Sequence, residues 1–153
     1  MKARFRTHTL LVLSVILQCG ALENPGYCQE VRRDSLAASG QGYQAIFEKV
    51  QAGISAGSVE PFAKHLAAEV VINLRGDESG TFSSKQAYYV LKNFFDLRRF
   101  GGFEFSTIAD SDANPYAAGS AEFTYKGARE DVQVYVALAY AGEKYVITQL
   151  TIY

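Results

Sequence analysis

Thiols and imidazoles are scarce in this chain of 153 residues, which has two cysteines and two histidines. Both cysteines, Cys19 and Cys28, lie within the first 28 residues, so cleavage before Gln29 would leave no thiol. A thiol-free chain has no disulfide framework, no thiolate nucleophile and no cysteine ligand for a metal. No cysteine and histidine cluster with zinc-ligand spacing is present either. The sequence therefore predicts neither a metal site nor a cofactor.

A membrane-spanning helix is also missing, because the apolar run Leu10–Leu17 is too short to cross a bilayer. This run follows the basic residues Lys2, Arg4 and Arg6, which is the order of a secretory signal peptide. We therefore predict a signal peptide over residues 1–28 and export to the periplasm or the medium. No transmembrane span is expected after processing.

Two alternatives for the leader stay open. Cleavage after Ala21 is the main rival, and it would retain Cys28 as a lone thiol. Lipid attachment at Cys19 is less favoured, because Gln18 stands where a lipoprotein signal needs a small residue.

An excess of basic residues is absent as well. The whole chain has 15 basic and 16 acidic residues. Residues 1–28 hold three of the basic residues and one of the acidic ones, so the remaining chain carries a net charge near −3. Nucleic-acid binding needs concentrated positive charge, so we expect no nucleic-acid partner.

The full chain has 48% apolar residues and no internal repeat, and the part after residue 28 fits one globular domain. Residues 29–42 are polar and rich in glycine, serine and alanine, as flexible linkers are. The sequence therefore predicts a linker over residues 29–42 and a single folded domain over residues 43–153.

Apolar spacing predicts three helices in the first half of the domain. The first has apolar residues at helical intervals and ends at Gly57. A second, short helix is expected over Val59–Ala67, with Ser58 as its cap. The third begins after Ser83, which forms a capping box with Gln86.

Alternating patterns predict the strands. A strand over Glu69–Leu74 is followed by turn residues at Gly76–Gly80. Beyond Gly102 the period changes to two, and short turns separate four strands, over Phe103–Ile108, Tyr116–Tyr125, Asp131–Tyr140 and Lys144–Tyr153. The element order predicts an α+β fold in which three helices pack on one face of a curved antiparallel sheet.

The alternation also assigns the two faces of the sheet. One side of the third of these strands is apolar and is expected to face the helices, and it comprises Val132, Val134, Val136 and Leu138. The opposite face, with Thr124, Tyr135 and Ile147, is less polar than a solvated face needs to be. We predict that these three residues form an interface with a protein partner or a second subunit.

Several short stretches carry a family resemblance. They are Ser84–Ala87, Val90–Leu91, Phe94–Phe95, Phe103, Tyr116, Gly119 and the closing Ile147–Ile152. Together they resemble the domain of unknown function 4783, a family of exported bacterial proteins that is similar to the nuclear transport factor 2-like superfamily. The resemblance implies a cone-shaped α+β fold that encloses a pocket and often dimerises through its sheet.

Five phenylalanines are expected to line the interior of this cone, namely Phe94, Phe95, Phe103, Phe105 and Phe123. An aromatic interior without an inward carboxylate can hold a ligand but has no evident base. The leading hypothesis is an exported, non-enzymatic binding module. It would use its apolar aromatic pocket or its sheet face to bind a small apolar ligand or a protein partner. No residue is predicted to be catalytic.

Two other functions stay open. The superfamily includes isomerases and dehydratases, so a small cone-fold enzyme of the isomerase, lyase or cyclase type is one alternative. It would use Asp96 or His65 as its acid–base group, with Tyr88 or Tyr116 as donor. Asp96 lies beside Arg98, however, and is expected in a solvated ion pair. The other alternative is a homodimeric structural domain with a filled core.

Overall fold

The structure, a computed structural model, describes residues 42–109 and 114–153. The predicted signal peptide and the predicted linker up to residue 41 lie outside the described residues. Within the described part, no helix combines the length and the apolar character needed to cross a membrane.

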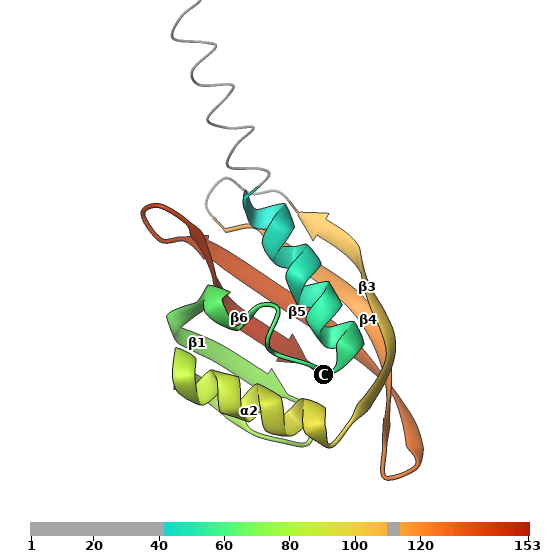
Figure 1. Cartoon of the computed structure of the whole chain (residues 1–153). Coiled ribbons are helices and arrows are strands. Elements are labelled where there is room, and N and C mark those ends of the chain that lie inside the picture. Colours follow the sequence, from blue (N-terminus) through green and yellow to red (C-terminus); the bar gives the residue numbers. More distant parts are fainter. Residues whose placement is uncertain (1–41, 110–113) are drawn as a thin grey trace, which may run out of the picture.

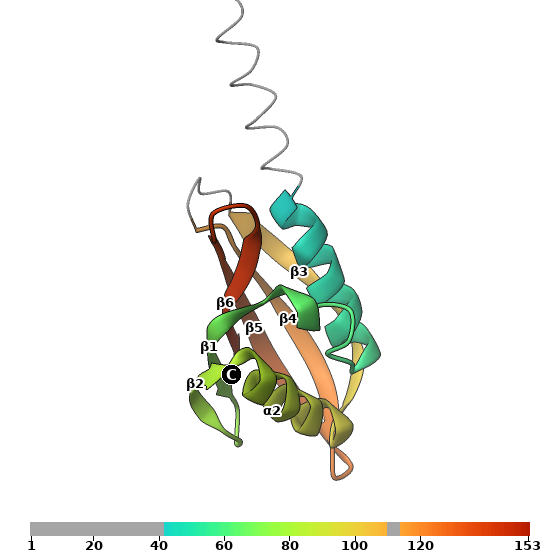
Figure 2. The ribbon, with the colours of Figure 1, turned by 60° about the vertical axis from the view of Figure 1, so that its left-hand side comes forward.

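Six strands form one curved sheet, and helices cover one of its faces (Figure 1 and Figure 2). In chain order the elements are helix 42–56, η1 (Ala63–His65), β1 (Leu66–Leu74), β2 (Ser79–Ser83), α2 (Ser84–Asp96), β3 (Arg99–Ala109), β4 (Tyr116–Tyr125), β5 (Ala128–Tyr140) and β6 (Tyr145–Ile152). The strands lie in the order β2-β1-β6-β5-β4-β3. Helix 42–56 lies along β3, while α2 packs against β1 and β2. The predicted α+β architecture is confirmed.

Helix α2 begins where its sequence predicts. The Ser83 hydroxyl oxygen accepts a hydrogen bond from the Gln86 backbone N–H at 3.4 Å, and Gln86 Oε1 accepts one from the Ser83 N–H at 3.1 Å. This reciprocal pair satisfies two backbone donors at the start of the helix. The buried residues of α2 are Ala87, Leu91, Phe94 and Phe95. The capping box therefore fixes where β2 ends and which side of α2 meets the sheet.

The helix predicted over Val59–Ala67 is wrong. A turn leads into a single 3₁₀ turn, η1, and β1 already begins at Leu66. The fully buried Phe62 ring packs so closely on Gly53 that a Cβ atom there would lie 2.6 Å from it. Leu66 takes extended geometry and pairs with Ile147 of β6. Sheet pairing overrides the helical spacing of the apolar residues, so the described residues contain two α-helices rather than three.

The sheet is mixed rather than wholly antiparallel. From β3 to β6, consecutive strands pair antiparallel, and β4 has the predicted bounds Tyr116–Tyr125. β1 and β2 are also antiparallel. β1 lies parallel to β6, however, with Ile72 opposite Leu150. This parallel pair joins the first and last strands of the domain, which are the second and third strands across the sheet.

The core side of β5 is as predicted, with Val132, Val134, Val136 and Leu138 all buried. The prediction that Ile147 lies on the outer face is wrong, because this residue is fully buried opposite Leu138. In β6, Thr148 is an extra residue between two paired positions. After it, Gln149 pairs with Ala137, the neighbour of Leu138 in β5. This β-bulge shifts the alternation by one residue and turns Ile147 toward the core.

Helix 42–56 covers part of the sheet edge that β3 forms. The Ser55 hydroxyl donates to the Phe103 carbonyl oxygen at 3.0 Å and accepts from the Phe103 N–H at 2.9 Å. Gln51 Oε1 accepts from the Phe105 N–H at 3.2 Å. Side chains of a helix thus satisfy three backbone groups that a neighbouring strand would otherwise pair.

Candidate functional site

Four phenylalanines pack as one aromatic cluster between α2 and the sheet. They are Phe94 and Phe95 of α2, Phe100 of β3 and Phe123 of β4, and their contacting pairs have ring centroids 5.4 to 6.4 Å apart. The sequence predicts Phe94, Phe95 and Phe123 as pocket lining, and all three are buried. Rings at these distances make edge-to-face or tilted contacts. This part of the interior is therefore packed core.

The other two phenylalanines predicted as pocket lining, Phe103 and Phe105, lie in β3. Their ring centroids are 4.7 Å apart, and the Phe105 ring is 5.6 Å from that of Phe47 in helix 42–56. Phe105 and Phe47 also line a surface depression of about 400 Å³, together with Tyr43 and Ile108. Phe105 therefore borders an open space beside helix 42–56, whereas Phe103 is buried.

A charged residue, Arg98, is buried against this aromatic cluster with 6% of its surface exposed. Its guanidinium carbon lies 3.8 Å from the ring centre of Phe94 and 4.6 Å from that of Tyr125. Nη1 forms an ion pair with Asp77 at 3.4 Å. Nε has no hydrogen-bond partner among the described residues. The sequence predicts Arg98 in a solvated ion pair with Asp96, and no local pattern signals that aromatic rings from α2 and β4 surround it.

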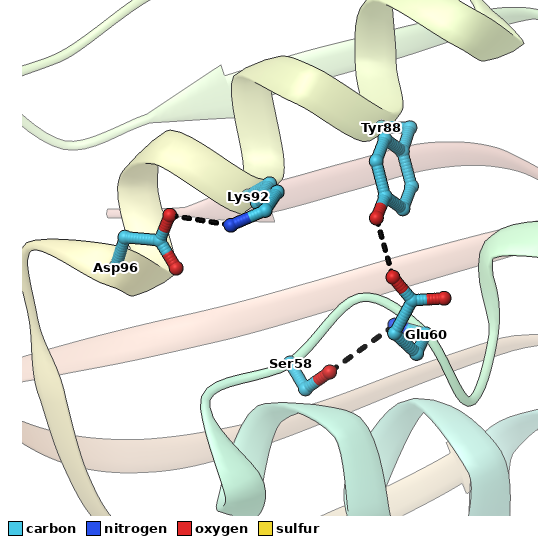
Figure 3. Close-up of polar contacts among 5 residues, drawn as sticks. All are labelled: Ser58, Glu60, Tyr88, Lys92 and Asp96. Atoms are coloured by element: carbon cyan, nitrogen blue, oxygen red, sulfur yellow. Dashed lines mark hydrogen bonds and ion pairs between the residues drawn. The ribbon is translucent and has the colours of Figure 1, made fainter.

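A cleft lies between the end of helix 42–56, the turn after it and α2 (Figure 3). It consists of two depressions of about 200 and 410 Å³ that share Gly57 and Asp96. Polar residues line the smaller depression, among them Ser58, Glu60, Tyr88 and Lys92. Residues that line the larger one include Phe95, Phe100, Ser55, Ala56, Arg98 and Arg99. We call this space the helix cleft.

One hydrogen bond joins the turn to α2 across the smaller depression, and a second lies within the turn (Figure 3). The Tyr88 hydroxyl donates to the Glu60 carboxylate, and the Glu60 N–H donates to the Ser58 hydroxyl oxygen at 3.3 Å. The hydrogen bond to Glu60 raises the pKa of the Tyr88 hydroxyl above its ordinary value of 10.0. A carboxylate beside the phenol disfavours the phenolate, so Tyr88 stays a neutral donor in this cleft.

Lys92 and Asp96 form the second polar pair of the helix cleft. Lys92 Nζ lies 2.6 Å from Asp96 Oδ2, one helical turn further along α2 (Figure 3). The two side chains are 47% and 56% exposed, and such surface pairs contribute about 1 kcal/mol or less. Asp96 is therefore an exposed carboxylate that is paired with a lysine of its own helix.

The other residues considered as acid–base groups lie elsewhere. His65 is in η1 and contacts helix 42–56, and Tyr116 lies on the outer face of β4. The structure thus brings Asp96 and Tyr88 into one cleft and leaves His65 and Tyr116 outside it. Across residues 42–109 and 114–153, no group of His, Cys, Asp and Glu side chains is arranged to hold a metal ion.

The outer face of the sheet is uncharged at its centre. Tyr135 of β5 and Thr124 of β4, both predicted as interface residues, are partly buried, and the ring centroid of Tyr135 is 5.6 Å from that of Tyr116. Outward positions around Tyr135 hold Ala118, Ser120, Gln133, Ala137, Gln149 and Thr151. Thr124, in contrast, pairs with Arg99 of β3 and Arg129 of β5. Ile147, the third predicted interface residue, belongs to the core.

Comparison with known proteins places this geometry in a family. The model of the family described as Domain of unknown function (DUF4783) matches residues 47–153. The crystal structure of a DUF4783 protein from Bacteroides uniformis ATCC 8492 is 20% identical with a TM-score of 0.62, covering 69% of this chain and 93% of that one. A second, from Bacteroides ovatus ATCC 8483, is 20% identical with a TM-score of 0.59, covering 68% and 90%.

A ketosteroid isomerase-like protein from Erwinia carotovora atroseptica SCRI1043 has a similar fold. It is 11% identical with a TM-score of 0.60, covering 73% of this chain and 92% of that one. No curated protein matches the sequence. These likenesses confirm the nuclear transport factor 2-like cone fold, but at such identities they transfer no site and no activity.

Proposed function

The chain belongs to the DUF4783 family, and from that premise we propose that it is an exported, non-enzymatic binding module. Its ligand is a small, largely apolar molecule with a negatively charged end, held in the helix cleft. Phe95 and Phe100 contact the apolar part of this molecule, and Arg99 binds its charged end.

The larger depression of the helix cleft is the observation that carries this proposal. Its volume of about 410 Å³ falls within the roughly 300–1,000 Å³ of small-molecule sites, which combine apolar walls with a few polar groups. Arg99 is exposed and forms no ion pair with a carboxylate in the described part of the chain. A negatively charged ligand group would therefore supply the partner that this guanidinium lacks.

Binding without catalysis is supported by the hydrogen bond and the ion pair that already occupy the carboxylates of the cleft. Glu60 accepts the hydrogen bond of Tyr88, and Asp96 is paired with Lys92. Each carboxylate therefore has a donor from the protein itself, and neither is enclosed by apolar walls. A general base, by contrast, needs an open acceptor within hydrogen-bond reach of a substrate proton.

The proposed location is outside the cytoplasm. It rests on the predicted signal peptide over residues 1–28 and on the order of its basic and apolar segments. We expect the intact mass of the protein recovered from an exporting cell to correspond to a chain that begins at Gln29. A mass that includes the whole leader would contradict export by this route.

A substitution that fills the cleft tests the proposed ligand site. Ala56 lines the larger depression, so Ala56→Phe would occupy the space proposed for the ligand. Ala52→Phe is the matched control, because Ala52 is exposed one turn earlier in the same helix. The probe is 8-anilinonaphthalene-1-sulfonate, which combines aromatic rings with one negative charge.

Fluorescence titration should show saturable probe binding by the unaltered protein and by Ala52→Phe. We expect Ala56→Phe to bind at least about tenfold more weakly, which corresponds to the loss of about 1.4 kcal/mol of binding free energy. Equal binding by the two variants would contradict a ligand site in the helix cleft. Far-UV circular dichroism of both variants checks that they are folded.

A second candidate function, self-association, is favoured by the outer face of the sheet. Because the centre of this face is uncharged, two copies meeting around a two-fold axis bring no like charges together there. We expect sedimentation of the unaltered protein to show a dimer that Tyr135→Glu dissociates. Tyr89→Glu is the control, since Tyr89 is exposed on α2. A monomer at every concentration would rule out this candidate.

A further inference from the structure

Three lysines from separate parts of the chain gather around His65 of η1. Lys49 of helix 42–56 places its Nζ 3.2 Å from His65 Nε2. Lys64 is the preceding residue of η1, and Lys144 stands in the connection between β5 and β6. All three act electrostatically on the imidazole. We call these four residues the lysine–histidine cluster, and it shares no residue with the helix cleft.

The lysines of this cluster form no ion pair, unlike four other cations of the described residues. Ion pairs elsewhere join Arg75 to Glu130, Lys92 to Asp96, Arg98 to Asp77 and Arg129 to Glu122. Within residues 42–109 and 114–153, Lys49, Lys64 and Lys144 form no ion pair with a carboxylate. Their ammonium groups are therefore not neutralised by an ion pair with a carboxylate of the described residues.

The protonation state of His65 follows from its neighbours. Burial, followed by the positive charges of Lys49, Lys64 and Lys144, lowers the pKa of the imidazole below its ordinary value of 6.5. The ring is therefore neutral at pH 7. An ammonium group has donors and no acceptor, so Nε2 accepts from Lys49 and the ring proton sits on Nδ1. The cluster thus presents three ammonium groups and an imidazole N–H as donors.

We propose that Lys49, Lys64, His65 and Lys144 form a binding site for a phosphate group. A phosphate monoester carries a charge of about −1.5 to −2 at pH 7 and three strong acceptor oxygens, and lysines bind it as point charges. A carboxylate has one charge and two oxygens, so it satisfies fewer of the donors that converge here. The phosphate monoester belongs either to a free small molecule or to a lipid headgroup that is itself a monoester, as in phosphatidic acid, because these two sources offer the same group.

Phosphate binding at this cluster is coupled to proton uptake by His65. A bound anion offsets the three positive charges around the ring, which come from helix 42–56, from η1 and from the β5–β6 connection. The imidazolium form is then less disfavoured, so the pKa of His65 rises when phosphate binds. By linkage, phosphate binds more tightly as the pH falls through the range in which His65 titrates.

An NMR titration of the His65 ring measures this coupling directly. His8 and His65 are the two histidines of the chain, so the full-length protein with His8→Gln has a single imidazole signal. We expect inorganic phosphate to raise the pKa of His65 relative to chloride at equal ionic strength. We expect Lys49→Met and Lys144→Met each to weaken phosphate binding by about tenfold, since each removes a charge-assisted hydrogen bond.

The matched control is Lys85→Met, because Lys85 is exposed on α2 and is not among the groups that act on His65. Vesicles that contain phosphatidic acid, with phosphatidylcholine vesicles as the neutral reference, separate the two sources. A pKa rise with inorganic phosphate supports a free phosphate ligand, and a rise with phosphatidic acid alone supports a lipid headgroup. The proposal is overturned if neither probe changes the pKa, or if Lys85→Met weakens binding as much as Lys144→Met.

Discussion

Replacing Arg98 separates what its charge contributes to stability from what its volume contributes. Two aromatic rings lie within 5 Å of the guanidinium carbon, at 3.8 and 4.6 Å, and each contact is worth about 1 kcal/mol. The Asp77 side chain is 34% exposed, so the ion pair adds about 1 kcal/mol or less. The buried Nε without a partner opposes these gains with a cost of about 1–3 kcal/mol. A hydrogen bond from Nη1 to the Phe94 carbonyl oxygen at 3.3 Å adds about 1 kcal/mol, so the gains exceed the cost by only about 1 kcal/mol.

Two substitutions then have different expected effects. Arg98→Met keeps a long, flexible side chain between Phe94 and Tyr125 and removes the unpartnered donor, so the free energy of unfolding should fall by about 1 kcal/mol or less. Arg98→Ala leaves a cavity in the same place and should lower it by about 3 kcal/mol, the middle of the range for large-to-small core substitutions.

Urea unfolding followed by far-UV circular dichroism measures both changes by linear extrapolation. Arg129→Met and Arg129→Ala are the controls, because the Arg129 side chain is 78% exposed and its pair with Glu122 lies at the surface. Both should change stability by less than about 0.5 kcal/mol. If Arg98→Met is as destabilising as Arg98→Ala, the buried charge itself stabilises the domain and the reasoning fails.

Three further predictions follow from local geometry. Gly119→Ala should lower the thermal midpoint and reduce the free energy of unfolding by about 2 kcal/mol, because the added Cβ would lie 2.5 Å from a backbone oxygen of β3. Gly101→Ala is the control and should be nearly neutral, because its nearest atom would lie 3.8 Å away. Glu60→Gln should lower the pKa of the Tyr88 hydroxyl, because the hydrogen bond to the Glu60 carboxylate raises that pKa. Phenolate absorbance in an alkaline titration measures the change, and an unchanged titration curve would contradict the hydrogen bond. Because folding lowers the pKa of His65, the unfolded chain binds more protons below about pH 6.5, so stability is full above that pH and falls as the pH drops toward the folded pKa. Urea unfolding across this range should show the fall, and His65→Gln should reduce it.

The parts of the fold that the sequence predicts are those set by residues close together in the chain. The start of α2 depends on Ser83 and Gln86, three positions apart, and their capping box is present. The faces of β5 follow from strict alternation between Val132 and Leu138, which continues without a bulge against β4. Local hydrogen bonding and period-two patterning can both be recognised in a single sequence.

The parts that the sequence misses depend on distant residues. The short segment before β1 has apolar residues at helical spacing, but Phe62 packs on Gly53 and Leu66 pairs with β6. The bulge at Thr148 reverses the face of Ile147, and nothing in the residue types around it differs from a regular strand. Tertiary pairing decides both cases, and local propensity is too weak to oppose it.

The candidate site is the least predictable part. Aromatic composition predicts that phenylalanine rings cluster, but it does not predict whether a space remains between them, because interiors pack to the density of organic crystals. Phe94 and Phe123 are buried in the packed core, while Phe95 also lines the helix cleft. The cleft joins Glu60 to Tyr88, 28 residues later, and that approach requires the turn which the sequence misassigns to a helix.

The cover over β3 has a consequence for how this protein avoids polymerising. An open strand edge accepts the extended segment of any other molecule and so allows fibres to grow. Here helix 42–56 covers that edge, and its Ser55 precedes the hydrogen-bond partner Phe103 by 48 residues. Because ribosomes synthesise the amino end first, the covering helix is made before the strand whose edge it covers. A proteolytic fragment that begins beyond this helix would retain all six strands and lose the barrier to strand exchange between molecules.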